Sequence, residues 1–414
     1  MVIASTDIAL FPFIEPGHPF HPHVERFRDA ISGERRCADL LGRTAGPGRT
    51  LIHAEIKGRT EGQGWALDRF YWSLQAWGAA SAPSDFAALT LVYAAKDDRL
   101  TWHTFPDDPY LTAMAASVAP CDERSLDRHG AAPDILRYVP LRRLTFHLNA
   151  LVGKVKRSSR CAEAYDTLTA VARAVNREAA SFDVAAPRGF DAARCLYFQS
   201  ALPGEDLAGL LDPANAPALL YRVGALHREL HDLDVTGVPI WDRGPFMADL
   251  GRDIRWIVWF RPDCAALLLG IEELLLERAP RMRPQIDRFC HGDFVCSQML
   301  VAGDQWAVTD FDLAHRGDPY RDIATLLTSL AYDVPVFQAP GQQAAVLEMP
   351  CAAYLRGYED RAGQRLDQGR LVWYRLCAEI SYLALMFKKD WFQPATCERA
   401  FARLRELRAQ MPGG

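Results

Sequence analysis

The strongest constraint on the fold is a short segment, residues 291–322, that carries three closely spaced acidic motifs. The first reads His-Gly-Asp-Phe-Val-Cys-Ser-Gln over 291–298, the second Val-Thr-Asp-Phe-Asp over 308–312, and the third Gly-Asp-Pro-Tyr-Arg-Asp over 317–322. Gly and Asp are common in turns, so one such motif alone would predict only a turn. Three of them in this order, with an apolar strand-like run at 306–309 that ends just before Asp310, predict a functional site.

Together the three motifs resemble the catalytic loop, the metal-binding loop and the following turn of the aminoglycoside phosphotransferase and choline kinase family. The resemblance implies a protein-kinase-like bilobal fold of class α+β and the transfer of phosphate from ATP, with Mg²⁺, to a hydroxyl of a small molecule. This chemistry needs a positioned hydroxyl and a neutralised triphosphate. The resemblance gives Asp293 the role of orienting or deprotonating the hydroxyl, and Asp310 the role of holding Mg²⁺.

Gln298 departs from the family pattern, because most members have Asn at this position. Some members, the maltokinases among them, also have Gln. Its amide oxygen can join Asp310 in holding Mg²⁺, since a hard cation prefers oxygen ligands. The resemblance also implies that His291 packs beneath the loop and bonds to backbone, and that Asp322 fixes the loop from behind.

Upstream of the motifs, the pattern predicts a small lobe. Short strand-like runs follow one another at 135–139, 144–148 and 151–156, and an apolar stripe at helical spacing predicts a helix over 160–176. A further strand, 195–201, runs into a Pro-Gly exit that resembles a hinge.

The resemblance places a nucleotide-binding lysine on a small-lobe strand and a glutamate on the helix to hold it. Lys154 and Glu163 fit these positions. Lys156 competes with Lys154, because side chains alternate along a strand and the two lysines share a face. Lys154 is favoured by the buried-strand character of the residues before it, whereas Lys156 opens a basic turn. A surface lysine without a ligand is the third reading.

The turn between the first two strands reads Pro-Leu-Arg-Arg and has no glycine, although the family places a short glycine-containing phosphate loop there. Glycine lets backbone amides approach phosphate. Either Arg142 and Arg143 neutralise the phosphates in place of backbone amides, or this turn lies further from the phosphates than in the family. The family implies that adenine sits at the hinge, 199–202, where backbone groups of Gln199 and Ala201 pair with its edge.

A separate unit is expected ahead of the kinase-like lobes, over residues 1–130. Strand-like alternation covers 50–57 and 88–105, the latter with a turn, and an aromatic-rich run predicts a short helix over 65–77. This α+β unit is expected to end in a loop near 128–133. It resembles the cap that maltokinases carry.

The remaining chain divides into a small lobe with its hinge, 131–202, and a mostly helical lobe, 203–414, that holds the catalytic and metal loops. The net charge of −5 does not suggest nucleic acid or an anionic membrane as a partner. The longest apolar stretch, 265–276, is interrupted by two glutamates and is too short for a membrane span. No secretory pattern opens the chain, and the ten cysteines form no CxxC pair, so we expect a cytoplasmic protein with reduced thiols.

The acceptor and the oligomeric state are not identified by the sequence. Aromatic and basic residues of the helical lobe could line an acceptor site, although aromatics at helical spacing are more often core: Arg252, Arg255, Trp256, Trp259, Trp373, Tyr374 and Trp391. Acidic residues that could attract a polycationic acceptor are also present, although charge on a helix face is usually solvated surface: Glu272, Glu273, Glu277, Glu359 and Asp360. A sugar is slightly favoured over an aminoglycoside or an amino alcohol by Gln298 and the N-terminal unit.

Two other functions compete with small-molecule phosphorylation. A pseudokinase or nucleotide-dependent binding protein is favoured by Gln298 and by the missing glycines, but opposed by the joint presence of Lys154, Asp293 and Asp310. A protein kinase is disfavoured, because the segment 310–322 is too short for an activation loop that holds a peptide.

Overall fold

The structure is a computed structural model that describes most of the chain. The described residues are 10–43, 49–61, 64–77, 86–111, 114–115, 133–279, 287–338, 343–389 and 392–411.

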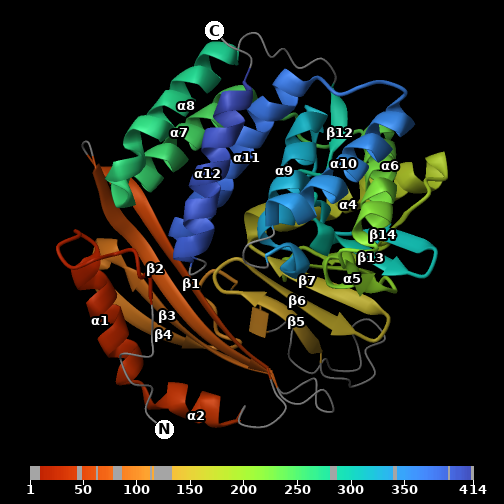
Figure 1. The fold of residues 1–414 in the computed structure, drawn as a ribbon. Helices are drawn as coiled ribbons and strands as arrows, with labels where there is room; N and C mark the ends of the chain where they lie inside the picture. Colours follow the sequence, from red (N-terminus) through yellow and green to blue (C-terminus); the bar gives the residue numbers. More distant parts are fainter. Residues whose placement is uncertain are drawn as a thin grey trace.

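An antiparallel sheet with the strand order β1-β2-β3-β4 opens the fold next to two helices (Figure 1). The elements are α1 (His21–Ser32), α2 (Arg35–Arg43), β1 (Arg49–Glu61), β2 (Gly64–Trp77), β3 (Phe86–Ala94) and β4 (Arg99–Thr104). A 3₁₀ turn, Ala95–Asp97, joins β3 to β4. The predictions of strands over 50–57 and 88–105, the second with a turn, are confirmed.

The predicted helix over 65–77 is wrong, because this segment is strand β2 inside the sheet. Burial is continuous from Phe70 to Ala76, so the alternation that marks a half-buried strand is missing. Phe70 packs against α1 in the largest core, whereas Tyr71 on the opposite face packs against Leu141 of the next sheet. Because other segments cover both faces of this strand, most of its side chains are apolar or aromatic. The same composition is found in buried helices, so composition does not distinguish the two.

A second antiparallel sheet, with the order β5-β6-β7-β10-β9, forms the small lobe together with helix α4. Its elements are β5 (Asp134–Val139), β6 (Arg143–Leu148), β7 (Leu151–Lys156), α4 (Ser158–Glu178), β9 (Pro187–Asp191) and β10 (Leu196–Ser200). The strands and the helix predicted for this lobe are confirmed to within a few residues.

The rest of the chain is a larger, mostly helical lobe (Figure 1). Its helices are α5 (Leu207–Leu210), α6 (Ala216–Asp232), α7 (Arg243–Phe260), α8 (Ala265–Arg278), α9 (Pro319–Tyr332), α10 (Gln343–Ala362), α11 (Gln368–Lys388) and α12 (Pro394–Gln410). Short strands in it are β8 (Asp183–Val184), β11 (Glu205–Asp206), β12 (Arg288–Cys290), β13 (Met299–Ala302), β14 (Gln305–Val308) and β15 (His315–Gly317). A sheet-rich small lobe and a helical large lobe confirm the predicted α+β, protein-kinase-like bilobal fold.

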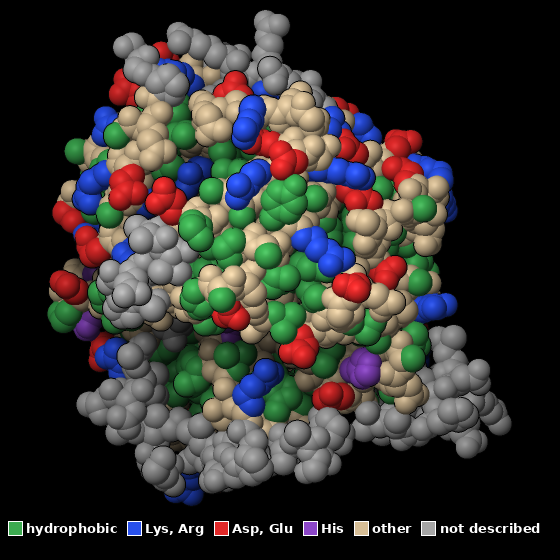
Figure 2. Space-filling view, turned by 45° about the vertical axis from the view of Figure 1, so that its right-hand side comes forward, with side chains coloured by type: hydrophobic (Ala, Val, Ile, Leu, Met, Phe, Trp, Pro, Cys, Tyr) green, Lys and Arg blue, Asp and Glu red, His purple; other side chains and the backbone are tan. Residues whose placement is uncertain are grey.

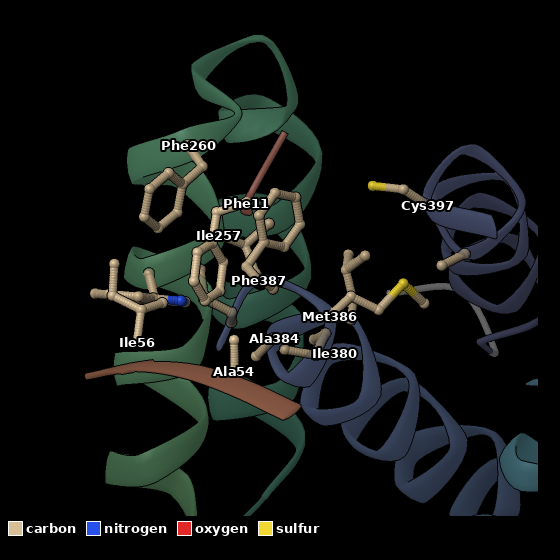
Figure 3. Packing of buried hydrophobic residues seen from close by; sticks show 14 of the residues in the cluster. Phe11, Ala54, Ile56, Ile257, Phe260, Ile380, Ala384, Met386, Phe387 and Cys397 are labelled. Carbon is tan, nitrogen blue, oxygen red and sulfur yellow. The ribbon is translucent and has the colours of Figure 1, made fainter. Parts of the chain in front are cut away.

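The N-terminal sheet shares its core with the helical lobe. Figure 3 shows Ala54 and Ile56 of β1 beside Ile257 of α7 and Phe387 of α11. All four side chains are at most 2% exposed. The sheet is therefore part of one continuous apolar core with the C-terminal helices, even though the small lobe lies between them in the sequence.

The N-terminal sheet also contacts the small lobe. The indole Nε1 of Trp77 donates a hydrogen bond of 2.6 Å to the carbonyl oxygen of Ile135 on β5, and Phe86 packs on Tyr138. The first part of the chain therefore joins both lobes. The expected boundary at residue 130 and most of the loop expected at 128–133 lie outside the described residues, and the division into three units stays a prediction.

Among the described helices, none combines the length and the apolar character that crossing a membrane requires.

Candidate active site

One face of the small-lobe sheet carries four basic side chains. Across neighbouring strands, Arg137 of β5 lies opposite Thr145 of β6, which lies opposite Lys154 of β7. On the adjacent rung, Arg143 lies opposite Lys156. Directly paired residues share a face of a sheet, and every second residue of a strand returns to that face. The four basic residues therefore point to the same side.

Asp310, just after β14, meets two of these basic groups. Its Oδ1 lies 3.1 Å from Lys154 Nζ, and its Oδ2 lies 3.0 Å from Arg143 Nη1. Burial would raise the pKa of Asp310, but Lys154 and Arg143 hold it far below its usual range. Burial would likewise lower the pKa of Lys154, but Asp310 raises it. The carboxylate is therefore ionised and shared by two cations across the cleft.

Asp312, two residues later, holds the other lysine. Its Oδ2 forms an ion pair with Lys156 Nζ, and its Oδ1 accepts a hydrogen bond of 3.3 Å from the hydroxyl of Tyr197 on β10. Lys154 and Lys156 thus have different carboxylate partners.

The His-Gly-Asp motif forms a tight loop after β12. Nε2 of His291 donates to the carbonyl oxygen of Thr309 at 2.8 Å, and Nδ1 accepts from the backbone N–H of Asp293 at 3.3 Å. Gly292 has a φ of +85°, and a Cβ there would lie 2.1 Å from the carbonyl oxygen of Leu313. A side chain at this position is excluded by that contact.

The Asp293 carboxyl is largely buried beside the other acids of the site. Burial raises the pKa of Asp293, and the charge of Asp310 adds to that effect, while His291 and Arg143 oppose it. A carboxylate with a raised pKa is a better proton acceptor than an exposed one. Asp293 and Asp310 line the same cavity.

Gln298 is anchored beside Thr309, the residue that precedes Asp310. Its Oε1 accepts a hydrogen bond of 3.1 Å from the hydroxyl of Thr309, and its backbone carbonyl accepts 2.8 Å from the Thr309 N–H. The amide oxygen of Gln298 is thereby held next to the residue that precedes Asp310.

Comparison with known protein families assigns the chain to one of them. A family model described as the phosphotransferase enzyme family matches residues 142–364, which is more than half of the chain. The chain belongs to the phosphotransferase enzyme family. The predicted family is thereby confirmed.

Solved structures of low sequence identity resemble this phosphotransferase. A choline/ethanolamine kinase family protein from Mesorhizobium loti is 17% identical, with a TM-score of 0.46 over 70% of this chain and 92% of that chain. Choline kinase LicA from Streptococcus pneumoniae is 9% identical, with a TM-score of 0.45 over 67% and 93%. An amicoumacin kinase solved with AMP-PNP and Ca²⁺ is 13% identical, with a TM-score of 0.48 over 67% and 87%. No curated protein sequence gives a significant match.

In this phosphotransferase, Asp322 of α9 supports the catalytic loop from within the core. Its Oδ2 accepts from the backbone N–H of His291 at 2.6 Å and its Oδ1 from that of Gly292 at 3.0 Å. Burial would raise the pKa of Asp322, but hydrogen bonding and charge from His227 and His231 of α6 hold it well below its usual range. The sequence analysis did not identify these two histidines, which lie one helical turn apart on a buried face.

Asp108 is a further residue that the sequence patterns do not single out, and it holds the turn between β5 and β6. Its Oδ2 accepts from the Leu141 N–H at 2.8 Å and from the Tyr138 hydroxyl at 2.7 Å. Leu141 has a φ of +65°, a conformation that costs energy for a non-glycine residue. An aspartate of the N-terminal unit therefore stabilises the glycine-free turn of the small lobe, and no local sequence signal links the two segments.

Two predicted nucleotide contacts have other partners in this structure. The pairing of Glu163 with Lys154 is not formed, because Glu163 Oε2 lies 3.4 Å from Arg160 Nη1 on the exposed side of α4. Arg142 forms an ion pair with Glu55 of β1, whereas Arg143 turns into the site. Sequence spacing alone could not predict which of the two adjacent arginines points into the site.

The hinge residues lie at the end of β10, where Gln199 is buried and lines a narrow space with Lys154 and Tyr197. The backbone N–H of Ala201 donates to the carbonyl oxygen of Ala150 at 2.9 Å. In this conformation the Ala201 amide is therefore already satisfied.

A cavity of about 1340 Å³ opens over the site. Asp293, Asp310 and Asp312 lie on one side of it, and β1 of the N-terminal sheet lines another, mostly over 51–60. The N-terminal unit is therefore a wall of the active-site cleft.

Most side chains considered as acceptor contacts lie elsewhere. Trp373 and Tyr374 are at most 1% exposed and belong to the core, and Arg255 pairs with Glu272 outside the cavity lining. Trp256 and Arg252 line the cavity. Trp391 lies outside the described residues. None of the five helical-lobe acids considered for a polycation lines the described cavity.

We predict that Asp322→Asn lowers the free energy of unfolding by about 1.5–3 kcal/mol at pH 7, because hydrogen bonds to a buried charged group are lost. The folded-state pKa of Asp322 is depressed, so its contribution is fully present above the unfolded pKa of about 3.9 and decreases progressively as pH falls from there towards the folded-state pKa. Urea unfolding at pH 7 and near pH 3 measures the difference. Asp107→Asn, whose side chain is 84% exposed, is the control. A deficit that stayed constant across this pH range would contradict the role of the charge.

Proposed function

We propose that the protein catalyses the Mg²⁺-dependent transfer of the γ-phosphoryl group of ATP to a hydroxyl of a small molecule. The observation that carries this proposal is the Asp310 carboxylate, ionised and shared by Lys154 and Arg143 within the cavity that also holds Asp293. Phosphoryl transfer needs cations for the phosphates, an oxygen ligand for the metal and a carboxylate near the hydroxyl. The three kinds of group are present together.

The residues around Asp310 fit a magnesium ion. Asp310 offers an ionised carboxylate, and Gln298 offers an amide oxygen held beside Thr309. Hard cations prefer such oxygen ligands. When bound, Mg²⁺ would neutralise charge on the triphosphate. Lys154 and Arg143, which hold Asp310 in the free protein, would then be available to bind phosphate oxygens.

Asp293 would orient the acceptor hydroxyl and accept its proton. Its backbone is fixed by His291, and Asp322 holds the preceding two amides. The raised pKa of Asp293 suits a proton acceptor. The adenine would lie beneath β10, where Gln199 and Tyr197 line the narrow space beside Lys154.

A nucleotide-binding protein without turnover is the second candidate. It is favoured by the glycine-free turn, in which Leu141 is locked by Asp108, because no backbone amide loop is free to cover the phosphates there. The two functions differ in whether the wild-type protein turns over substrate; only an enzyme has a turnover that depends on the Asp293 carboxylate.

We predict that Asp293→Asn lowers kcat by at least about 100-fold, because general base catalysis and hydroxyl positioning are lost together. The melting temperature should stay close to that of the wild type, since no described side-chain hydrogen bond of Asp293 is lost. Acceptor-dependent ADP release measures turnover, and Asp107→Asn is the control. Near-normal kcat in Asp293→Asn would exclude the proposed role, and ATP binding without any turnover in the wild type would favour the second candidate.

The two lysines give a separate prediction about the nucleotide. Lys154→Ala should raise the KM for Mg²⁺-ATP more than Lys156→Ala does, because Lys154 contacts Asp310 while Lys156 contacts Asp312. Steady-state kinetics with varied nucleotide measures both. The reverse order would assign the nucleotide contact to Lys156.

A further inference from the structure

The cleft is basic although the whole protein is acidic. Twelve Lys and Arg residues and seven Asp and Glu residues are among the described residues that line the cavity, whereas the chain has a net charge of −5. Figure 2 shows that blue and red side chains are interspersed over one outer face. Positive charge is therefore concentrated in the cavity.

Most basic groups of the cavity already have an acidic partner. Arg143 and Lys156 pair with the two metal-loop aspartates, and Arg142 pairs with Glu55. Others pair with carboxylates on their own or a neighbouring helix: Arg160 with Glu163, Arg252 with Asp249, and Lys388 with Asp253.

Arg137 has no such partner, because its guanidinium forms no hydrogen bond or ion pair with the described residues while it lines the cavity. Arg69 also has no acidic partner among them, but its guanidinium lies over the ring of Tyr110, 5.0 Å from the ring centroid. Arg137 follows a β-bulge at Leu136, where the pairing of β5 with β6 shifts by one residue. Bulges of this kind re-aim side chains and are frequent next to active sites.

Arg137 lies within electrostatic reach of the reacting groups. Burial and the charge of Arg143 lower the pKa of Arg137, while Asp310 and Asp293 raise it. The unpaired guanidinium therefore lines the same cavity as the carboxylate that would orient the acceptor hydroxyl.

Lys389, at the end of α11, brings a second cation to the same place from the helical lobe. A backbone bridge joins it to Glu55 of β1. Burial lowers the pKa of Lys389 to about 8, Glu55 opposes this effect, and Arg142 and Arg137 add to it. Burial, Lys389, Arg142 and Arg137 also lower the pKa of the neighbouring His53 to about 4. Arg137 of β5, Arg142 of the following turn and Lys389 of α11 therefore bring positive charge to the side of the cavity that β1 lines.

We propose that the acceptor carries an anionic group, a carboxylate or a phosphate, which Arg137 and Lys389 bind at the wall formed by β1. This inference rests on the proposed function and specifies its acceptor class. In the proposed function the phosphates of the nucleotide would have other cations, Lys154 and Arg143, which pair with Asp310 in this structure. A polycationic acceptor would be repelled by the excess positive charge of the cleft.

The test uses the full-length protein saturated with Mg²⁺ and AMP-PNP, so that the nucleotide site is filled before an acceptor analogue is added. Thermal unfolding is then followed with glycerol 3-phosphate, glycerate, neutral glycerol or cationic kanamycin, at constant ionic strength. We expect at least one of the two anions to raise the melting temperature beyond the effect of glycerol, because it binds only the folded state. Kanamycin should give no rise.

Arg137→Gln should weaken binding of that anion about tenfold, because a charge-assisted hydrogen bond is lost, and Arg137→Lys should recover part of the effect. Lys389→Gln should act in the same direction. The matched control is Arg59→Gln, which removes a basic group from the same cavity where it pairs with Glu61 on an exposed part of β1. It should leave both the AMP-PNP shift and the anion shift unchanged.

The inference is overturned if neither anion exceeds glycerol, if kanamycin stabilises the protein more than the anions do, or if Arg137→Gln and Arg59→Gln behave alike. It is also overturned if Arg137→Gln abolishes the shift by Mg²⁺ and AMP-PNP, because Arg137 would then be a nucleotide ligand. If instead the wild type shows no shift with Mg²⁺ and AMP-PNP, the proposed function itself fails. The measurement with Mg²⁺ and AMP-PNP therefore tests the proposed function, and the measurement with the anions tests the inference about the acceptor.

Discussion

The ion pairs of Asp310 with Lys154 and Arg143 join the two lobes across the cleft. The cations come from neighbouring strands of the small-lobe sheet, and the carboxylate comes from the loop after β14 in the helical lobe. All three groups are largely shielded, since their side chains are between 11% and 27% exposed. A shielded charge without a partner of opposite sign costs free energy. Each of the three groups therefore needs the opposite charge of its partner, unless a bound ion supplies that charge instead. The same contact that joins the lobes thus keeps ionised the carboxylate that we propose as a metal ligand.

The N-terminal sheet determines how these lobes are held. It shares an apolar core with α7 and α11 (Figure 3) and it also contacts the small lobe through Trp77, while Asp108, in the segment after β4, binds the small lobe as well. Its first strand faces the cavity. A unit that contacts both lobes and lines the space between them limits what can enter, and it supplies part of the surface on which an acceptor would lie.

The sequence predicted those parts of the molecule that depend on local patterns. The strands and helix of the small lobe followed from periodicity, and the motifs around Asp293 and Asp310 lie together at the cleft. What depends on distant contacts was not predicted. The residue pattern of β2 predicts a helix because tertiary contacts cover both faces of the strand. Asp108 and Arg137 gain their significance only from segments brought together by the fold. In this conformation Lys154 pairs with Asp310 and not with the expected Glu163, and spacing along a helix does not say which of its sides faces the sheet.

The most direct test of this account is thermal unfolding of the protein with Mg²⁺ alone, ATP alone and both together, for the wild type and for Asp310→Asn. Magnesium must compete with Lys154 and Arg143 for the carboxylate, and ATP offers those two cations a new anion, so the two ligands should bind cooperatively. The account predicts a rise with both ligands that exceeds the sum of the separate rises and that is lost in Asp310→Asn. No rise with millimolar Mg²⁺-ATP, or an equal rise in Asp310→Asn, would contradict it.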